Sequence, residues 1–136
     1  MPDTYANTDA VSPLPAFPKW LGVTLQLCTA DKVVGQMHIT ADHANRNGVL
    51  HGGAMMAFAD SLGGTAASAN LSEGQRTTTV ESKTNFLRAV RLGETITGTC
   101  TPLHRGRRTT VWQTEVTRQD GKTAAVILQT QLTLEP

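Results

Sequence analysis

A single carboxylate stands in a stretch of sequence that otherwise carries no ionisable side chain. Between Gly52 and Leu71 the only acidic or basic residue is Asp60. The spacing of apolar residues predicts a helix over this stretch, and a helix that faced water would carry several charges. Because a buried carboxylate destabilises a protein unless it has partners, we expect Asp60 to have a function, as a nucleophile or as a general base.

A histidine and two glycines stand where the predicted helix begins. Without Cβ atoms, Gly52 and Gly53 would let a substrate carbonyl approach the backbone N–H groups at the positive end of the helix dipole. Such an arrangement is the outline of an oxyanion hole. Taken alone, the same residues are also typical of a plain turn in which His51 is a capping or core residue.

The separation of these two features predicts a second copy of the chain. Gly52 and Asp60 are eight residues apart in the sequence, which is roughly 12 Å along a helix, too far for both to contact one carbonyl carbon. Two helices packed antiparallel about a two-fold axis would bring Gly52 of one chain near Asp60 of the other. The sequence therefore predicts a homodimer with shared sites.

The two faces of the predicted helix differ in a way that fits such a dimer. Apolar residues at spacings of three and four predict a core face, made of Met55, Phe58, Ala59, Leu62 and Ala66. Small residues surround the carboxylate on the other face, made of Gly53, Ala57, Asp60, Gly64 and Ala67. We expect protein to cover both faces, because the glycines, hydroxyls and carboxylate are too polar for a membrane span.

The remaining sequence predicts a sheet around this helix. Alternation with a period of two predicts a hairpin over residues 23–27 and 32–39, and later strands over 77–87, 94–103, 109–117 and 123–134. A short helical turn is expected over 17–22, a polar loop over 42–48 and a tight turn at Asp120-Gly121. One long helix with antiparallel strands before and after it predicts the α+β class.

Length, charge and cysteine content limit the domains and partners. The 136 residues suffice for one domain, which we place at 16–136 after a loosely ordered arm over 1–15. A net charge of +1 gives no broad field for nucleic acid or an anionic bilayer. Cys28 and Cys100 lack metal-ligand spacing, so no metal or other cofactor is expected. The N-terminus lacks the pattern of a signal peptide, which predicts a cytoplasmic protein with two free thiols, although one disulfide is also possible.

The spacing Asn45-x-x-Gly48-x-x-His51-Gly52-Gly53, with Asp60 nine residues after the histidine and Leu92-Gly93-Glu94 later, resembles a known family. It is similar to the hotdog-fold acyl-CoA thioesterases of the 4-hydroxybenzoyl-CoA thioesterase superfamily, in the phenylacetate-pathway (PaaI-like) branch. The resemblance covers nearly everything after residue 20. It implies a long central helix wrapped by a curved antiparallel sheet, a homodimer with sites at the interface, and a homotetramer built as a dimer of dimers.

The resemblance also implies roles for individual residues. Asp60 matches the family's nucleophile or general base, and Gly52 matches the residue whose N–H polarises the thioester carbonyl. Asn45 matches a side chain that positions the thioester or water, and His51 matches a residue that orients the loop and carbonyl.

A threonine on the strand after the helix completes the implied site. Thr79 falls where some members place a hydroxyl near the nucleophilic water, and a slip of one residue would put Thr78 there instead. One turn after the acid, where another branch carries threonine, this chain has Gly64. That departure favours the PaaI-like branch.

Two groups of basic residues in a nearly neutral chain are candidates for binding the phosphates of coenzyme A, which would be part of the substrate and not a cofactor. They are Arg88 with Arg91, and His104 with Arg105, Arg107 and Arg108. Solvated hairpin ends are the alternative. The acyl group is expected near Gly53 and the few bulky residues, and aryl, arylacetyl and medium-chain groups all remain open. These bulky residues are Met55, Met56, Phe58, Phe86 and Trp112.

Two other functions were weighed against thioester hydrolysis. A hotdog hydratase or dehydratase would carry a His-Phe-Pro stretch or an Asp and His pair placed for proton transfer, and neither is recognisable. A non-catalytic acyl-CoA sensor would dispense with the acid and add a DNA-binding segment. A coenzyme A release assay would separate hydrolysis from both.

Overall fold

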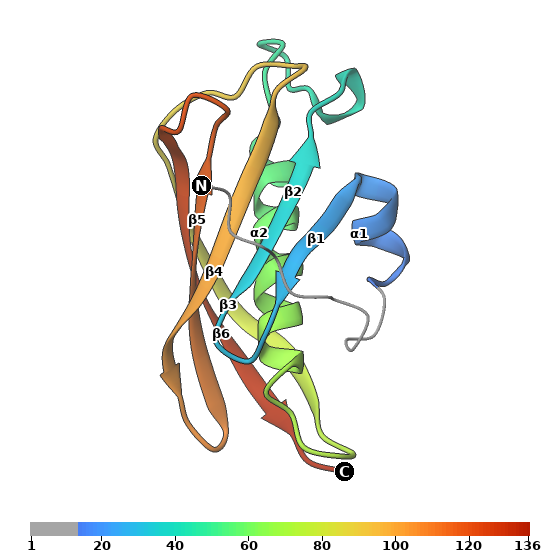
Figure 1. The fold of residues 1–136 in the computed structure, drawn as a ribbon, viewed down its shortest axis with the longest axis vertical. Coiled ribbons are helices and arrows are strands. Elements are labelled where there is room, and N and C mark those ends of the chain that lie inside the picture. The colour runs from blue at the N-terminus through green and yellow to red at the C-terminus, as the bar shows by residue number, and fades with distance from the viewer. Residues whose placement is uncertain (1–13) are drawn as a thin grey trace.

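The computed structural model describes residues 14–136, so most of the arm predicted over 1–15 lies outside the described residues. Within them, a six-stranded antiparallel sheet curves around one long helix (Figure 1). The elements are α1 (Ala16–Leu21), β1 (Val23–Cys28), β2 (Val33–His38), the 3-10 turn η1 (Ala41–His43), α2 (Gly52–Ser68), β3 (Arg76–Phe86), β4 (Thr95–Arg105), β5 (Thr109–Thr117) and β6 (Thr123–Leu134). The strand order is β1-β2-β4-β5-β6-β3. The predicted α+β fold with a central helix is confirmed.

Helix α2 begins at Gly52, as predicted, but ends at Ser68 and not at Leu71. The side-chain amide of Asn70 donates hydrogen bonds to the carbonyls of Ala66 and Ala30, each at 2.9 Å. These bonds occupy a carbonyl that a longer helix would need for its own backbone. The last turn is thereby tied to the loop after β1.

The core face of α2 lies against the sheet, as the periodicity predicts. Met55, Phe58, Ala59, Leu62 and Ala66 are all buried. Two glycines that pair across β2 and β4 make this close approach possible. A Cβ added at Gly35 or at Gly98 would lie 2.5 Å from a methyl carbon of Leu62, closer than packed carbon atoms come.

The expectation for the other face of α2 needs correction for a single chain. Ala67, assigned to that face, is 3% exposed and packs in the core. Asp60 and Gly53 are exposed. Within the described residues, therefore, protein covers α2 on one side, and a second cover would have to come from outside residues 14–136.

A bulge in β3 sets which of its side chains face α2. Thr79 pairs with Gln131, but the next pair is Glu81 with Thr130, so that Val80 is an extra residue. Because alternate residues of a strand face opposite sides, an unbroken strand would turn Glu81 and Lys83 toward the helix. The bulge turns the small hydroxyl residues Ser82 and Thr84 there instead.

Both cysteines are free and buried, which agrees with the expected thiols. Burial raises the pKa of the Cys100 thiol to about 11. Burial also raises the pKa of Cys28. Both thiols are therefore protonated near neutral pH. No helix among residues 14–136 is long and apolar enough to cross a membrane.

Candidate active site

Asp60 lies near the middle of α2, and β3 brings one predicted partner to it. The Thr79 hydroxyl donates a hydrogen bond to Asp60 Oδ1 at 2.9 Å. Thr78, the alternative to Thr79, makes no such bond. The structure thus brings Asp60 and Thr79 together as the sequence indicated.

Two buried glutamines on β6 extend this contact into a hydrogen-bonded network. Gln129 Nε2 donates to Asp60 Oδ1 at 3.0 Å, and Gln131 Nε2 donates to the Thr79 hydroxyl at 2.6 Å. The Thr77 hydroxyl in turn donates to Gln131 Oε1 at 2.9 Å. Asp60 Oδ1 therefore accepts two hydrogen bonds, whereas Oδ2 has no protein donor among residues 14–136.

Gln129 and Gln131 are functional candidates that the sequence interpretation missed. Each is 1% exposed, on the face of β6 that also buries Ala125 and Ile127. A signal was available, because two amide side chains continue the alternation of buried apolar residues and a buried amide must find partners. The tight fit is visible at Gly63, where a Cβ would lie 1.9 Å from Gln129 Oε1.

A cavity of about 960 Å³ opens beside the carboxylate. Its polar wall consists of Thr29, Asp60, Ser61, Thr65, Ser68, Thr77, Thr78, Thr79 and Gln131. Its apolar wall includes Leu14, Pro15, Phe17, Pro18 and Cys28. The carboxylate therefore faces a space large enough for a small organic ligand.

The start of α2 is built by a histidine cap. His51 Nδ1 accepts a hydrogen bond from the Gly53 N–H at 2.8 Å, which satisfies one of the unpaired donors of the first turn. The Gly52 N–H has no acceptor among residues 14–136. Of the two glycine donors considered from the sequence, Gly52 is therefore the one free to meet a substrate oxygen.

The loop before α2 is held in place from both sides. Asn45 Oδ1 accepts hydrogen bonds from the backbone N–H groups of Asn47 and Val49 at 2.8 and 3.3 Å. The His51 N–H donates to the carbonyl of His43 at 2.7 Å. The amide group of Asn45 keeps its own N–H donors, so it can shape the loop and still bind a ligand.

A second, smaller cavity of about 390 Å³ lies at this end of the helix. It is lined by Asn45, Val49, Leu50, Gly52, Met55, Phe86, Leu87, Arg88, Ala89 and Val90. No residue is shared with the cavity at Asp60. In one chain, the predicted oxyanion donor and the predicted carboxylate therefore belong to two separate half-sites.

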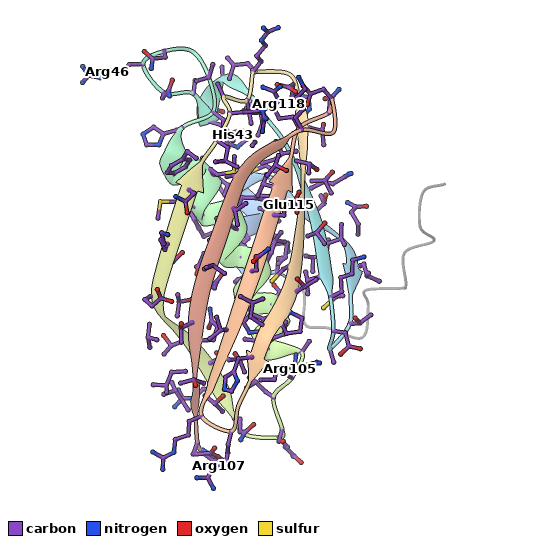
Figure 2. The ribbon with its side chains drawn as sticks, turned by 90° about the vertical axis from the view of Figure 1, so that its left-hand side faces the viewer. His43, Arg46, Arg105, Arg107, Glu115 and Arg118 are labelled. Carbon is purple, nitrogen blue, oxygen red and sulfur yellow. The ribbon has the colours of Figure 1, made fainter. Side chains whose placement is uncertain are left out.

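The two basic groups lie at opposite ends of the molecule. Arg118 donates a hydrogen bond to the carbonyl of Ala89 and so marks the end that carries Arg88 and Arg91. Figure 2 shows Arg118 at one end and Arg107, on the β4–β5 hairpin, at the other. Arg105 forms an ion pair with Asp31 at 2.7 Å. His104, Arg107 and Arg108 are exposed beside it.

The bulky residues proposed for the acyl pocket divide into two groups. Met56 and Phe86 are 37% and 55% exposed and remain available to a ligand. Phe58 and Trp112 are fully buried in the core, so their assignment to the pocket is wrong. Both lie on inward positions of their elements, where apolar side chains pack. The described residues contain no cluster of three or more His, Cys, Asp or Glu that could hold a metal ion.

Comparisons with known proteins show which sequences and folds this chain is similar to. The family model for the thioesterase superfamily matches residues 47–125. The 1,4-dihydroxy-2-naphthoyl-CoA hydrolase of Escherichia coli is 37% identical over 75 residues, which cover 55% of this chain and 54% of that enzyme. A thioesterase from Haemophilus influenzae has a crystal structure that matches with a TM-score of 0.82 and 30% identity, covering 87% of this chain and 82% of that one. The PaaI protein of the E. coli phenylacetic acid degradation operon matches with a TM-score of 0.78 and 26% identity, covering 86% and 83%.

Proposed function

Because this chain belongs to the thioesterase superfamily and is a thioester hydrolase, we propose that its substrate is an acyl-CoA or aryl-acyl-CoA thioester. The observation that carries this proposal is the carboxylate of Asp60, fixed by Thr79 and Gln129 and open to a large cavity. The products are the free acid and coenzyme A. Thr79 and the loop residues Asn45 and His51 act as supporting groups.

Asp60 acts by one of two routes. In the nucleophilic route its carboxylate attacks the thioester carbon, the C–S bond breaks, and water then hydrolyses the resulting anhydride. In the general-base route Asp60 removes a proton from water, the hydroxide forms the new C–O bond, and the proton passes to the departing thiolate. Both routes consume one water and regenerate the carboxylate.

The Gly52 N–H stabilises the negative charge that develops on the carbonyl oxygen. A free backbone donor at a helix N-terminus is suited to this task, because its position is fixed before the reaction begins. Gly52 and Asp60 belong to different half-sites of one chain. The complete site is therefore proposed to form between two chains, each contributing one half.

The free edge of the sheet supports this homodimer. Strand β3 spans 11 residues and, among residues 14–136, pairs only with β6, so its other edge is open there. An open strand edge readily pairs with another copy of itself. Val80, Phe86 and Leu87 expose more than half of their side chains along it. Antiparallel pairing of two β3 strands would also set the two α2 helices side by side.

Such a dimer brings both basic groups to each site. In an antiparallel pair, the hairpin end of one chain lies beside the Gly52 end of the other. Arg88 and Arg91 of one chain and His104, Arg107 and Arg108 of the other are then placed to bind the phosphates of coenzyme A. Phe86, Met56 and Gly53 are proposed to contact the acyl end, and a further association into tetramers follows the family resemblance.

A coenzyme A release assay with a panel of acyl-CoA thioesters tests the proposal. The expected result is turnover of at least one aryl, arylacetyl or medium-chain substrate, lost in the Asp60→Asn variant. Tight binding of acyl-CoA without release of coenzyme A would favour a binding protein. Addition or removal of water at the acyl double bond, with the thioester intact, would favour a hydratase.

A further inference from the structure

A series of hydrogen bonds runs from the beginning of β3 to the carboxylate of Asp60. Thr77 donates to Gln131, Gln131 donates to Thr79, and Thr79 donates to Asp60, over 2.9, 2.6 and 2.9 Å. We call Thr77, Gln131 and Thr79 the donor series. Its members come from two adjacent strands, and only Thr79 touches Asp60.

The direction of the donor series is fixed by the chemistry of its members. An amide has one accepting and one donating end, and a hydroxyl has a single proton. Because the Thr77 proton occupies the carbonyl of Gln131, the NH₂ group of Gln131 faces Thr79. Thr79 then accepts from Gln131 and has its one proton left for Asp60.

Gln129 is the second residue that donates a hydrogen bond to Asp60 Oδ1. Its Nε2 donates to Asp60 Oδ1 at 3.0 Å, while its Oε1 is buried without a hydrogen-bond partner among residues 14–136. A buried carbonyl without a partner costs stability. Leucine at this position would avoid that cost, so the amide is explained by its donor and not by packing.

We propose that the donor series and Gln129 are positioning residues that anchor Asp60 through Oδ1 and leave Oδ2 as the reacting oxygen. This inference rests on the proposed function only for the statement that Asp60 reacts. Both glutamines are uncharged at every pH, so they orient the carboxylate without a countercharge that would weaken it as a nucleophile or base. Thr79 accordingly directs its proton to Asp60 and not to the attacking water.

Thr77 is the residue to change, because it makes no contact with Asp60 and three hydrogen bonds separate the two. Thr77→Val keeps the shape of the side chain and removes its proton, so that the amide of Gln131 is free to turn over. Thr130→Val is the matched control: it is the same substitution on the same pair of strands, and it removes a 2.6 Å bond to Glu81 on the opposite face of the sheet.

Two properties are measured for each variant. The first is kcat and KM for the best thioester substrate, where Thr77→Val is expected to lower kcat by about 3- to 10-fold, the value of about one hydrogen bond, with KM changed less. The second is the ¹³C signal of the Asp60 carboxyl group without ligand at constant pH, assigned by comparison with Asp60→Asn. That signal should move in Thr77→Val and stay in Thr130→Val.

A double variant separates positioning from general packing. Thr79→Val should lower kcat further than Thr77→Val, and Thr77→Val added to Thr79→Val should have no further effect, because the series is already cut. Thr79→Ser should retain most of kcat. Additive losses, or a lower melting temperature with kcat and the Asp60 signal unchanged, would overturn the proposal. A displaced Asp60 signal in a protein that hydrolyses no thioester would uphold the donor series and reject the proposed function.

Discussion

The two half-sites on α2 are built on opposite principles. At Asp60 the candidate group is a side chain whose Oδ1 accepts two hydrogen bonds, supported by glutamines that are 1% exposed. At Gly52 the candidate group is a backbone N–H without an acceptor among the described residues, at the end of a loop. A buried hydrogen-bonded network holds the Asp60 carboxylate. The Gly52 N–H stays unpaired, because the His51 cap accepts the N–H of the neighbouring Gly53 instead.

The carboxylate and the backbone N–H differ in what is needed to fix their orientation. A carboxylate on a flexible side chain needs partners to fix its orientation, and orientation contributes strongly to catalysis. A backbone N–H at the start of a helix is already fixed by the helix, so it needs only to remain unpaired. His51 Nδ1 accepts the hydrogen bond of the Gly53 N–H, so the Gly52 N–H has no acceptor among the described residues.

The largest effect is expected at the Asp60 half-site. Asp60→Asn keeps an oxygen that can accept from Thr79 and Gln129 but removes the basic and nucleophilic carboxylate. We expect kcat to fall on the order of 10²-fold or more, with an unchanged melting temperature. Steady-state kinetics on the purified variant test this, and nearly full activity would show that Asp60 is not the reacting group.

The next largest effect is expected when two inactive variants, each defective in one half-site, are combined in one dimer. Gly52→Val should block the approach of the carbonyl to the backbone N–H, so both it and Asp60→Asn should be inactive alone. Co-refolding them at equal amounts makes half of the dimers mixed, and one site in each mixed dimer is intact. Activity should therefore return to about a quarter of wild type.

The controls for this mixing experiment are the separately refolded variants and a count of mixed dimers by differently tagged chains. If mixed dimers form and activity does not return, each site lies within one chain. An active monomer in sedimentation experiments would lead to the same conclusion.

The helix of the Asp60 half-site could be predicted because the spacing of apolar residues indicates α2 from Gly52 and its core face. Thr79, which lies beside Asp60, was expected there from the family resemblance and not from any period in the sequence. Gln129 and Gln131 were overlooked, because glutamine in a threonine-rich strand is usually exposed. The burial of Gln129 depends on Gly63, whose missing side chain admits its amide.

Features that depend on single irregular residues could not be predicted. The bulge at Val80 carries no glycine or proline to mark it, yet it decides that Ser82 and not Glu81 faces the helix. The sequence likewise indicated Arg88 and Arg107 as basic groups without showing that they lie at opposite ends. That placement arises from the pairing of strands distant in sequence.

At the Gly52 half-site, a change of His51 should have an intermediate effect. His51→Ala removes the cap from the Gly53 N–H, which should cost about 1 kcal/mol of stability and lower kcat about tenfold through displacement of the loop. His51→Asn offers an oxygen in place of Nδ1 and should restore both. Thermal melts and kcat measure the two effects, and loss of kcat in the asparagine variant with normal stability would instead indicate direct contact of the imidazole with substrate.

The smallest effect is expected at the β4–β5 hairpin. Replacing Arg107 and Arg108 together by alanine should raise KM for acyl-CoA by less than about tenfold, because exposed charge pairs contribute little each. The value of kcat should stay within a few-fold, since binding energy lost equally from substrate and transition state affects KM alone.

Salt should weaken the binding of acyl-CoA to the wild type more than to the Arg107 and Arg108 double variant, because exposed phosphate contacts are screened over about 10 Å at 0.1 M ionic strength. An acyl-N-acetylcysteamine thioester, which lacks the nucleotide, serves as the control and should not distinguish the two proteins. Loss of kcat on both substrates at unchanged KM would place the hairpin in the architecture of the active site and not in the binding of coenzyme A.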